Sequence, residues 1–314
     1  MSMQHTLKNS FTITDIGLHS GRDVTMTAHP AGVDHGIVFK RIDMTNLSPA
    51  DQSVKALWNN VVDTRLCTVI ANDKGAHVGT IEHLMAALRA CGVDNALIEI
   101  NAAEVPVIDG SSIRFVEEIE KVGLHVQSAP RRAIRILKEV KIKEGDKVIT
   151  LSPSNVPVFE GLIDYSSVPA IGVQSFTLKL VNGNFKHDVA DCRTFGLLQD
   201  VEAMKAAGLA LGGSMDNAVV VDDDRVLNPE GLRCRDEFIR HKILDAVGDI
   251  ALAGGLMLGH YKGLRGGHAM NNKVLHALFA DPDAYEIIDL YLDIAEADMA
   301  IYNDISPKPS VAAL

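Results

Sequence analysis

The chain has 314 residues, of which 47% are hydrophobic and 23% charged, a composition typical of a soluble globular protein with about two domains. Its formal net charge of −11 argues against a general nucleic-acid binder, which would need a basic surface, but allows one basic pocket for a phosphorylated ligand. The four cysteines form no Cys-x-x-Cys pair, the N-terminal segment lacks the apolar core of a signal peptide, and no uninterrupted apolar run approaches the roughly 20 residues of a membrane helix. We therefore expect a reduced, cytoplasmic protein without a transmembrane segment.

The first part of the sequence contains predicted strands and two predicted helices. Apolar alternation and short apolar runs predict strands at residues 24–30, 36–42, 61–71 and 95–100. Helical spacing predicts helices at residues 81–92 and 113–123, each ended by a glycine. Thr80 is expected to cap the first of these helices.

A similar order of elements follows in the second part. A hairpin is expected around Glu144-Gly145-Asp146, within residues 133–153. Further strands are expected at residues 158–165, 175–180 and 217–224. Further helices are expected at residues 198–209, 238–255, 272–280 and 284–300, followed by a disordered tail at 306–314.

The two parts have similar content, which indicates an internal duplication. The segments "VTMTAHP" at 24–30 and "VITLSP" at 148–153 occupy like places in the two parts. We expect a first domain at residues 1–128 and a second domain at residues 129–314.

The segment "FIRHKILDAVGDIALAGG" places an imidazole and two carboxylates on one stripe of a largely apolar helix. His241, Asp245 and Asp249 are spaced four residues apart, which keeps them within about 80° of one another. Burying such a stripe without partners would cost several kcal/mol per charged group. Two interpretations follow: the acids pair with Arg240, Lys242 or another element, or the stripe contributes to a metal site.

A second group of polar residues begins the first predicted helix, in "GTIEHLMAAL". Glu82 and His83 are adjacent, and neighbouring helical residues point about 100° apart, so both could flank one site. A histidine ligand beside a glutamate base follows the logic of H-E-x-x-H zinc peptidases, although the spacing differs. The alternative is that Glu82 favours the helix dipole while His83 packs in the core.

Combined, these helices offer two imidazoles and one carboxylate. His83, His241 and Asp245 would leave one position open on a bound ion, which is the arrangement of a catalytic zinc site. Iron(II) sites use the same ligand types, so the ligands alone do not fix the metal. Asp249, one turn further along its helix, is better placed to hold another group than to ligate.

The glycine-rich segment "GLRGGHAMNNK" carries a further imidazole. Gly266 and Gly267 precede His268, which predicts an exposed, mobile loop. The segment matches neither the dinucleotide-binding nor the NTP-binding glycine motif, so we expect neither kind of site.

Four motifs together resemble the UDP-3-O-acyl-N-acetylglucosamine deacetylase family: "TIEHLMAAL", "DCRTFG", "FIRHKILDAVGDIALAG" and "RGGHAMN". Their order and separations fit that family, and the resemblance extends from "GLHSG" at 17–21 to His268 and beyond. The family consists of zinc amidases that catalyse the committed step of lipid A synthesis in Gram-negative bacteria. The resemblance implies hydrolysis of the N-acetyl group of UDP-3-O-[(3R)-3-hydroxyacyl]-N-acetylglucosamine, giving acetate and the free amine.

The resemblance also implies a metal centre and its base. His83, His241 and Asp245 match the family's ligands to Zn²⁺, and Glu82 matches its general base.

Further roles are implied for five other residues. His268 matches the imidazole that acts as general acid, and Asp249 matches the carboxylate that orients it. Thr194 matches a hydroxyl that steadies the oxyanion. Lys242 matches a lysine near the substrate diphosphate, and Phe195 an aromatic ring stacked on the nucleotide or sugar.

The fold implied by the resemblance is α+β, with two similar β-α-α-β domains that sandwich the helices between two sheets. Each domain would carry a small insert, and the second insert would form an apolar passage for the acyl chain. This insert is expected at residues 197–226, whose leucine, methionine, alanine and glycine content would suit an apolar passage or an ordinary core.

Two rival functions stay open. A zinc peptidase would act on peptides and not on acylated sugar nucleotides. A non-catalytic carrier of lipid-linked sugars would hold a structural metal, closed by a fourth protein ligand. Nothing in the sequence demands an oligomer, so a monomer is expected.

Overall fold

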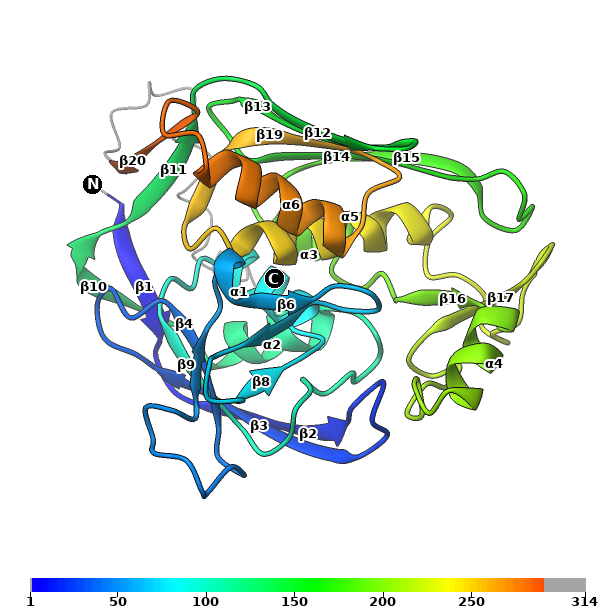
Figure 1. The fold of residues 1–314 in the computed structure, drawn as a ribbon, viewed down its shortest axis with the longest axis horizontal. Coiled ribbons are helices and arrows are strands. Elements are labelled where there is room, and N and C mark those ends of the chain that lie inside the picture. The colour runs from blue at the N-terminus through cyan, green and yellow to red at the C-terminus, as the bar shows by residue number, and fades with distance from the viewer. Residues whose placement is uncertain (1, 291–314) are drawn as a thin grey trace, which may run out of the picture.

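The computed structural model describes residues 2–290 of the chain. These residues form four layers: a sheet, two layers of helices and a second sheet (Figure 1). This arrangement is the α+β sandwich expected from the sequence.

The lower sheet in Figure 1 has five strands, in the order β2-β3-β9-β4-β5. Strand β9 pairs antiparallel with β3 and parallel with β4, while β2 and β5 are antiparallel edge strands. The bounds are β2 Phe11–Ile16, β3 Asp23–Pro30, β4 Ile37–Arg41, β5 Ser53–Lys55 and β9 Ala96–Ile100.

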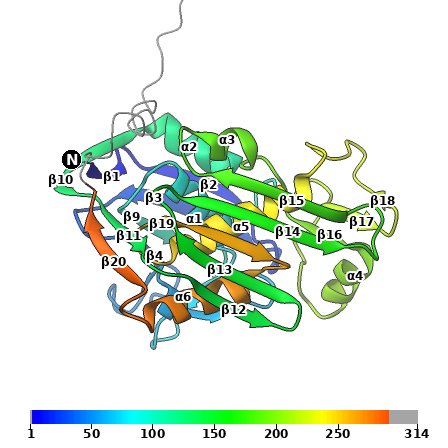
Figure 2. The same cartoon turned by 90° about the horizontal axis from the view of Figure 1, so that it is seen from above.

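The upper sheet has seven strands, which Figure 2 shows from above. Strand β19 is its centre: it pairs antiparallel with β13 and parallel with β14, and β12 and β15 lie outside these. Strand β11 pairs parallel with the first part of β19 and antiparallel with β20. The bounds are β11 Arg132–Ile136, β12 Val140–Glu144, β13 Lys147–Pro153, β14 Val158–Tyr165, β15 Gly172–Lys179, β19 Leu256–Leu264 and β20 Tyr285–Asp289.

The pairing pattern of the lower sheet recurs in the upper sheet. The series β2-β3-β9-β4-β5 and β12-β13-β19-β14-β15 have the same order and the same directions of pairing. Strand β13 takes the place of β3, as the sequence comparison of "VITLSP" with "VTMTAHP" predicts. The duplication is therefore confirmed at the level of topology.

The helices of the two halves also correspond. One helix precedes the central strand of each sheet (α1 and α5) and one follows it (α2 and α6). The bounds are α1 Glu82–Ala90, α2 Ile113–Val122, α5 Glu237–Ala251 and α6 His268–Phe279. Helices α1 and α5 pack against each other between the sheets, so nearly all their residues are buried, including the polar ones.

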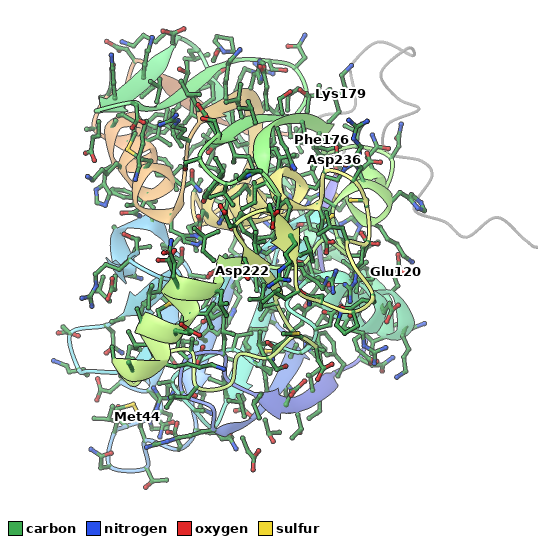
Figure 3. All side chains as sticks on the ribbon, turned by 90° about the vertical axis from the view of Figure 1, so that its right-hand side faces the viewer. Met44, Glu120, Phe176, Lys179, Asp222 and Asp236 are labelled. Carbon is green, nitrogen blue, oxygen red and sulfur yellow. The ribbon has the colours of Figure 1, made fainter. Side chains whose placement is uncertain are left out.

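Each half carries an insert before the helix that leads to its central strand, α1 in the first half and α5 in the second. The first is a small sheet of β6 Val61–Asp63, β7 Val69–Ala71 and β8 His77–Val78, preceded by the short helix η1 Trp58–Asn60. The second contains β16 Phe195–Leu197, α4 Leu198–Ala206, β17 Val219–Asp222 and β18 Arg225–Val226. It follows α3 Asn184–Asp188. Figure 3 shows Asp222 of this insert below Phe176 of the upper sheet and above Met44 of the lower half.

The strands β1 Met3–Leu7 and β10 Leu124–Pro130 pair antiparallel and form a separate two-stranded sheet. The expected domain boundary at residues 128/129 falls within β10, and the division into two domains there stays a prediction.

Several sequence predictions are wrong in detail. Residues 61–71 form two antiparallel strands joined by a turn, not one strand. Thr80 does not cap α1: it has a φ of 53°, its hydroxyl bonds to Glu104, and the residue at the N-cap is Ile81. His268 begins α6 and does not lie on a loop. Residues 285–289, expected to be helical, form β20 because they pair with β11.

Residues 291–300 of that expected helix and the tail at 306–314 lie outside the described residues. Within residues 2–290, none of the helices combines the length and the apolar character needed to cross a membrane.

Candidate active site

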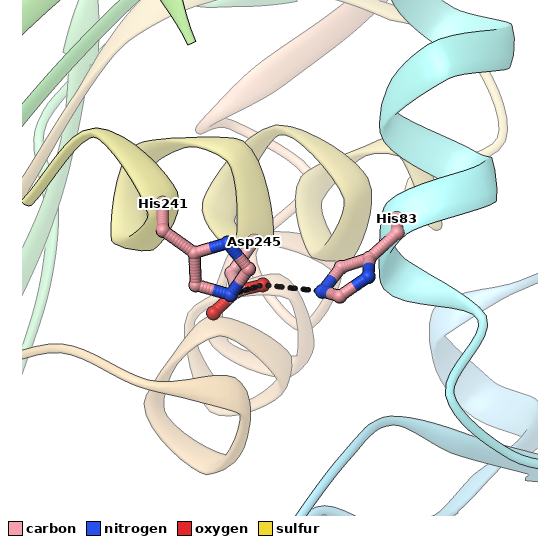
Figure 4. A group of neighbouring side chains, drawn as sticks. All are labelled: His83, His241 and Asp245. Carbon is pink, nitrogen blue, oxygen red and sulfur yellow. Dashed lines mark ion pairs between the residues drawn. The ribbon is translucent and has the colours of Figure 1, made fainter. Parts of the chain in front are cut away.

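The side chains predicted to bind a metal come together between α1 and α5. His83 is in the first turn of α1, while His241 and Asp245 are one turn apart on α5. Figure 4 shows the three side chains converging from the two helices. All three are buried, and their potential ligand atoms lie within 4.8 Å of one another.

Oδ1 of Asp245 is the atom on which this cluster converges. It lies 3.5 Å from Nε2 of His83 and 3.3 Å from Nε2 of His241. It is buried and accepts no hydrogen bond, a costly situation for a carboxylate oxygen. Ligand atoms around a tetrahedral metal ion, with bonds of about 2.1 Å, lie about 3.4 Å apart. The three side chains therefore fit a divalent metal ion.

The protonation states of the cluster suit metal binding. Burial lowers the pKa of His241 to about 3, so its ring is neutral at pH 7. Its Nδ1 lies 3.0 Å from the carbonyl oxygen of Cys192, a bond that directs Nε2 towards Asp245.

Lys242 complements the charge of Asp245. Its Nζ donates a hydrogen bond of 2.8 Å to Oδ2 of Asp245, which leaves Oδ1 for a metal ion. Burial alone would raise the pKa of Asp245, but His241 and Lys242 together lower it well below its usual range. The carboxylate is therefore ionised, as a ligand must be.

Glu82 lies next to His83 and reaches the same space. The backbone N–H of Thr68 donates a hydrogen bond of 3.1 Å to Oε2 of Glu82, and Oε1 lies 3.7 Å from Nε2 of His268. Burial raises the pKa of Glu82, although His268 acts in the opposite direction. A buried carboxylate with a raised pKa beside a metal cluster is suited to accept a proton.

His268 is held from the other side by Asp249. Its Nδ1 lies 2.8 Å from Oδ2 of Asp249. Burial lowers the pKa of His268, but the carboxylates of Asp249 and Glu82 outweigh this effect and raise it to about 10. His268 is thus protonated at neutral pH and forms a buried acid–base pair with Glu82. Asp249 lies one turn beyond Asp245 and holds this imidazole, as its position on the helix suggested.

The segment "DCRTFG" runs along one side of the cluster. The carbonyl of Cys192 accepts the hydrogen bond from His241, and the ring of Phe195 lies 6.4 Å from the ring of His241 and 5.6 Å from Nζ of Lys242. Thr194 stands between Cys192 and Phe195 in the sequence. It is half-buried, and its backbone N–H donates a hydrogen bond to the carbonyl of Gly110. All nine residues singled out in the sequence therefore belong to α1, α5, the start of α6 or this segment.

Other buried polar residues of the site were not predicted. Thr68 and Asn271 both hydrogen-bond to Asp249, and Tyr261 bonds to Asn271. The hydroxyl of Ser112 bonds to the carbonyl of His83 and so fixes the start of α1. Asn271 follows His268 by three residues on a helix, a spacing that could have indicated it. Thr68 has no local signal, because only the fold brings it to the site.

A His/His/Asp cluster beside a buried glutamate and a protonated histidine, held between equivalent helices of a duplicated sandwich, defines a metal-dependent hydrolase. The family described as UDP-3-O-acyl N-acetylglycosamine deacetylase matches residues 4–280 of this chain. The chain belongs to this family of metalloenzymes, whose members hydrolyse an amide bond.

Individual relatives support the same assignment. The chain is 45% identical over 294 residues to the UDP-3-O-acyl-N-acetylglucosamine deacetylase of Phenylobacterium zucineum, covering 94% of this chain and 99% of the relative. It is 46% identical to the enzyme of that name from Geotalea uraniireducens, covering 92% of each chain. It is 43% identical to that of Haemophilus influenzae, covering 92% of this chain and 93% of the relative.

Proposed function

We propose that this chain hydrolyses the N-acetyl group of UDP-3-O-acyl-N-acetylglucosamine, giving acetate and the free 2-amino sugar nucleotide. The observation that carries this proposal is the convergence of the two buried imidazoles on an oxygen of Asp245 that accepts no hydrogen bond, beside an acid–base pair. The substrate is proposed from family membership, and the cleavage of an amide is proposed from the geometry of the site.

His83, His241 and Asp245 would hold the metal ion, for which we propose Zn²⁺ because two nitrogens and one oxygen suit it. When bound, Zn²⁺ supplies Lewis-acid polarisation of the acetyl carbonyl and lowers the pKa of water towards neutrality. The cluster offers three ligands among the described residues, which supports an open, catalytic site over a closed, structural one.

The acid–base chemistry falls to Glu82 and His268. Glu82, ionised, takes a proton from the water that attacks the acetyl carbonyl. His268, protonated and held by Asp249, gives a proton to the leaving nitrogen, so that the C–N bond breaks to an amine and not to an amide anion. The products are acetate and the amine, and one water is consumed.

Thr194, Lys242 and Phe195 face the substrate in this proposal. The hydroxyl of Thr194 would donate to the oxyanion that develops on the acetyl oxygen, a contribution of about 3 kcal/mol for one such donor. Lys242, held by Asp245 through one of its three donors, keeps two for the diphosphate. Phe195 presents its ring near Lys242 for stacking on the nucleotide or sugar.

A pocket adjoins the cluster on the side of the upper sheet. Lys242, Asp245 and four glycines line it together with apolar residues. Of the four glycines, Gly267 has no atom near the place of a β-carbon and so leaves its backbone open to close approach by a ligand, and Lys242 supplies positive charge. We assign this pocket to the polar part of the substrate.

The second insert is assigned to the acyl chain. A buried apolar cluster joins Val219 and Val221 of this insert to Phe238 of α5. Leu211 and Met215 expose 54% and 41% of their surface, unusual values for large apolar side chains. We propose that the passage for the acyl chain runs along these residues, within the expected insert at 197–226.

We further propose that the chain acts in the cytoplasm as a monomer. Its four cysteines are all free in the structure, which suits a reducing compartment. Gel filtration with light scattering tests the monomer.

The proposed function is tested by measuring acetate release from UDP-3-O-acyl-N-acetylglucosamine and, in parallel, from an N-acetylated peptide. We expect turnover of the sugar nucleotide alone. Turnover of the peptide alone would identify the peptidase, and binding of the sugar nucleotide without any acetate release would identify a carrier.

A further inference from the structure

Asp249 accepts hydrogen bonds from three side chains, only one of which belongs to the proposed acid–base pair. Its Oδ2 accepts from Nδ1 of His268 and from Nδ2 of Asn271, each at 2.8 Å. Its Oδ1 accepts from the hydroxyl of Thr68 at 2.6 Å. All these partners except His268 are nearly fully buried. The carboxylate is thus fixed on both oxygens, in a setting where loss of a bond leaves a buried charge short of a partner.

Thr68 hydrogen-bonds to both Glu82 and Asp249, which belong to different halves of the chain. It lies just before β7 in the insert of the first half, and Asp249 lies on α5 of the second half. The backbone N–H of Thr68 bonds to Oε2 of Glu82 while its hydroxyl bonds to Asp249. The 3.7 Å separation of Glu82 and His268 therefore depends on a residue that bonds to the carboxylates on both sides.

Asn271 is itself oriented from β19. The hydroxyl of Tyr261 donates a hydrogen bond of 2.7 Å to Oδ1 of Asn271, which turns Nδ2 towards Asp249. Without this bond the amide could rotate and present its oxygen to the carboxylate, an unfavourable contact. The chain of bonds runs from Tyr261 through Asn271 and Asp249 to His268.

We propose that Thr68 and Asn271 are positioning residues for the deacetylation, which act through Asp249 on His268 and do not contact the substrate. The inference rests on the proposed acid–base roles of Glu82 and His268. Partners that orient a catalytic group from outside the site are commonly worth 10- to 100-fold in activity. Thr68 is the sharper test, because Thr68→Val has nearly the same shape and keeps the N–H that bonds to Glu82.

The experiment compares Thr68→Val with Thr68→Ser, which restores a hydroxyl, and with Thr6→Val as a matched control. Thr6 is also buried, and its hydroxyl donates to the carbonyl of Asn95 and accepts from the backbone N–H of Ala31, neither of which belongs to the site. For each variant we would measure metal content, kcat, KM and the dependence of kcat on pH. Thr68→Val should lower kcat about 10-fold or more, with little change in KM or metal content.

The pH profile separates positioning from a loss of fold. His268 faces the carboxylates of Asp249, Glu82 and, at longer range, Asp245, and all of them favour its protonated form. A loosened Asp249 supports that form less, so the basic limb of the Thr68→Val profile should move to lower pH. Thr68→Ser should recover most of kcat and the position of the limb.

If Thr68→Val does not fold, a second variant, Tyr261→Phe, tests the same proposal. Tyr261→Phe removes only the hydroxyl that orients Asn271, and should give a smaller change of the same kind. Tyr285→Phe, which also removes a single hydroxyl, is its control.

Unchanged kcat and pH profile in Thr68→Val and Tyr261→Phe, with activity lost in Asp249→Asn, would overturn this inference and leave the proposed function intact. Equal losses in Thr68→Val and Thr68→Ser, accompanied by loss of metal, would overturn it too, by indicating a structural role. Full activity in Asp249→Asn and His268→Gln would instead contradict the proposed acid–base roles themselves.

Discussion

The backbone carbonyl of Glu82 occupies the space that a side chain on Gly248 would need. A β-carbon built on Gly248 would lie 2.0 Å from the carbonyl oxygen of Glu82, far inside van der Waals contact. Helices α1 and α5 approach this closely only because residue 248 is a glycine. The contact brings Glu82 and His83 on one helix to His241 and Asp245 on the other.

Gly248→Ala should therefore force α1 and α5 apart. We expect the free energy of unfolding to fall by about 1–3 kcal/mol, the range typical of overpacking, or by more. The atom in the way is a backbone carbonyl oxygen, which cannot rotate aside as a side chain could. Metal affinity and activity should fall with it. Thermal unfolding and metal content measure both effects, with Gly32→Ala as control because a β-carbon there meets open space. An unchanged Tm and metal content in Gly248→Ala would refute this account of the helix contact.

Metal removal should abolish activity reversibly. Prolonged chelation should remove the ion held by His83, His241 and Asp245, and added Zn²⁺ should restore turnover. His83→Ala should lose both metal and activity, and Zn²⁺ should not rescue it. Elemental analysis follows the metal, and reconstitution with iron(II) compares the two candidate ions. Full turnover in a metal-free sample would contradict the metalloenzyme assignment.

The dependence of kcat/KM on pH should be bell-shaped. Glu82 must be ionised to accept a proton; burial raises its pKa, so the acidic limb should lie above the usual range of a glutamate. His268 must be protonated, and its pKa of about 10 places the basic limb well above that of an ordinary histidine. Asp249→Asn removes one cause of this rise, so its basic limb should move to lower pH. A basic limb that stays in place in Asp249→Asn would argue against His268 as its source.

The apolar insert should matter in proportion to acyl chain length. Leu211→Ala should lower kcat/KM most for long-chain substrates, since each methylene kept from burial costs about 0.8 kcal/mol. Ile287→Ala, an exposed apolar residue on β20, is the control. Equal losses on long-chain and acyl-free substrates would count against the passage.

The structure also explains why neighbouring positions would be poor choices for this test. A β-carbon on Gly212 would lie 2.3 Å from the carbonyl oxygen of Gly17, and Ala210 has a φ of 51°. Bulky substitutions at either position would disturb the fold of the insert before they reached an acyl chain. Leu211, exposed between them, avoids this problem.

The residues of the candidate site could be predicted because their signals are local. His241, Asp245 and Asp249 lie at a spacing that a helix translates into one stripe, and Glu82 and His83 are adjacent at a helix start. The repeat of the sheets was also visible, in the like positions of "VTMTAHP" and "VITLSP". These features depend on short stretches of chain whose conformation the sequence pattern determines.

Features set by tertiary contact could not be predicted. Thr68 looks like any strand-edge threonine until the fold places it against Asp249 on α5. Thr80 has the chemistry of a helix cap, but its hydroxyl is used by Glu104. Residues 285–289 have helical spacing, yet pairing with β11 makes them a strand. In each case a partner distant in sequence overrides a local preference.

The central claim is that Glu82 is the base of a metal-dependent deacetylation. The most direct measurement is kcat/KM of Glu82→Gln for UDP-3-O-acyl-N-acetylglucosamine, on protein whose bound metal has been quantified. Glutamine keeps the shape of the side chain but cannot accept a proton. We expect Glu82→Gln to bind as much metal as the unmodified protein and to react at least about 100-fold more slowly. A rate close to that of the unmodified protein, with metal bound, would contradict it.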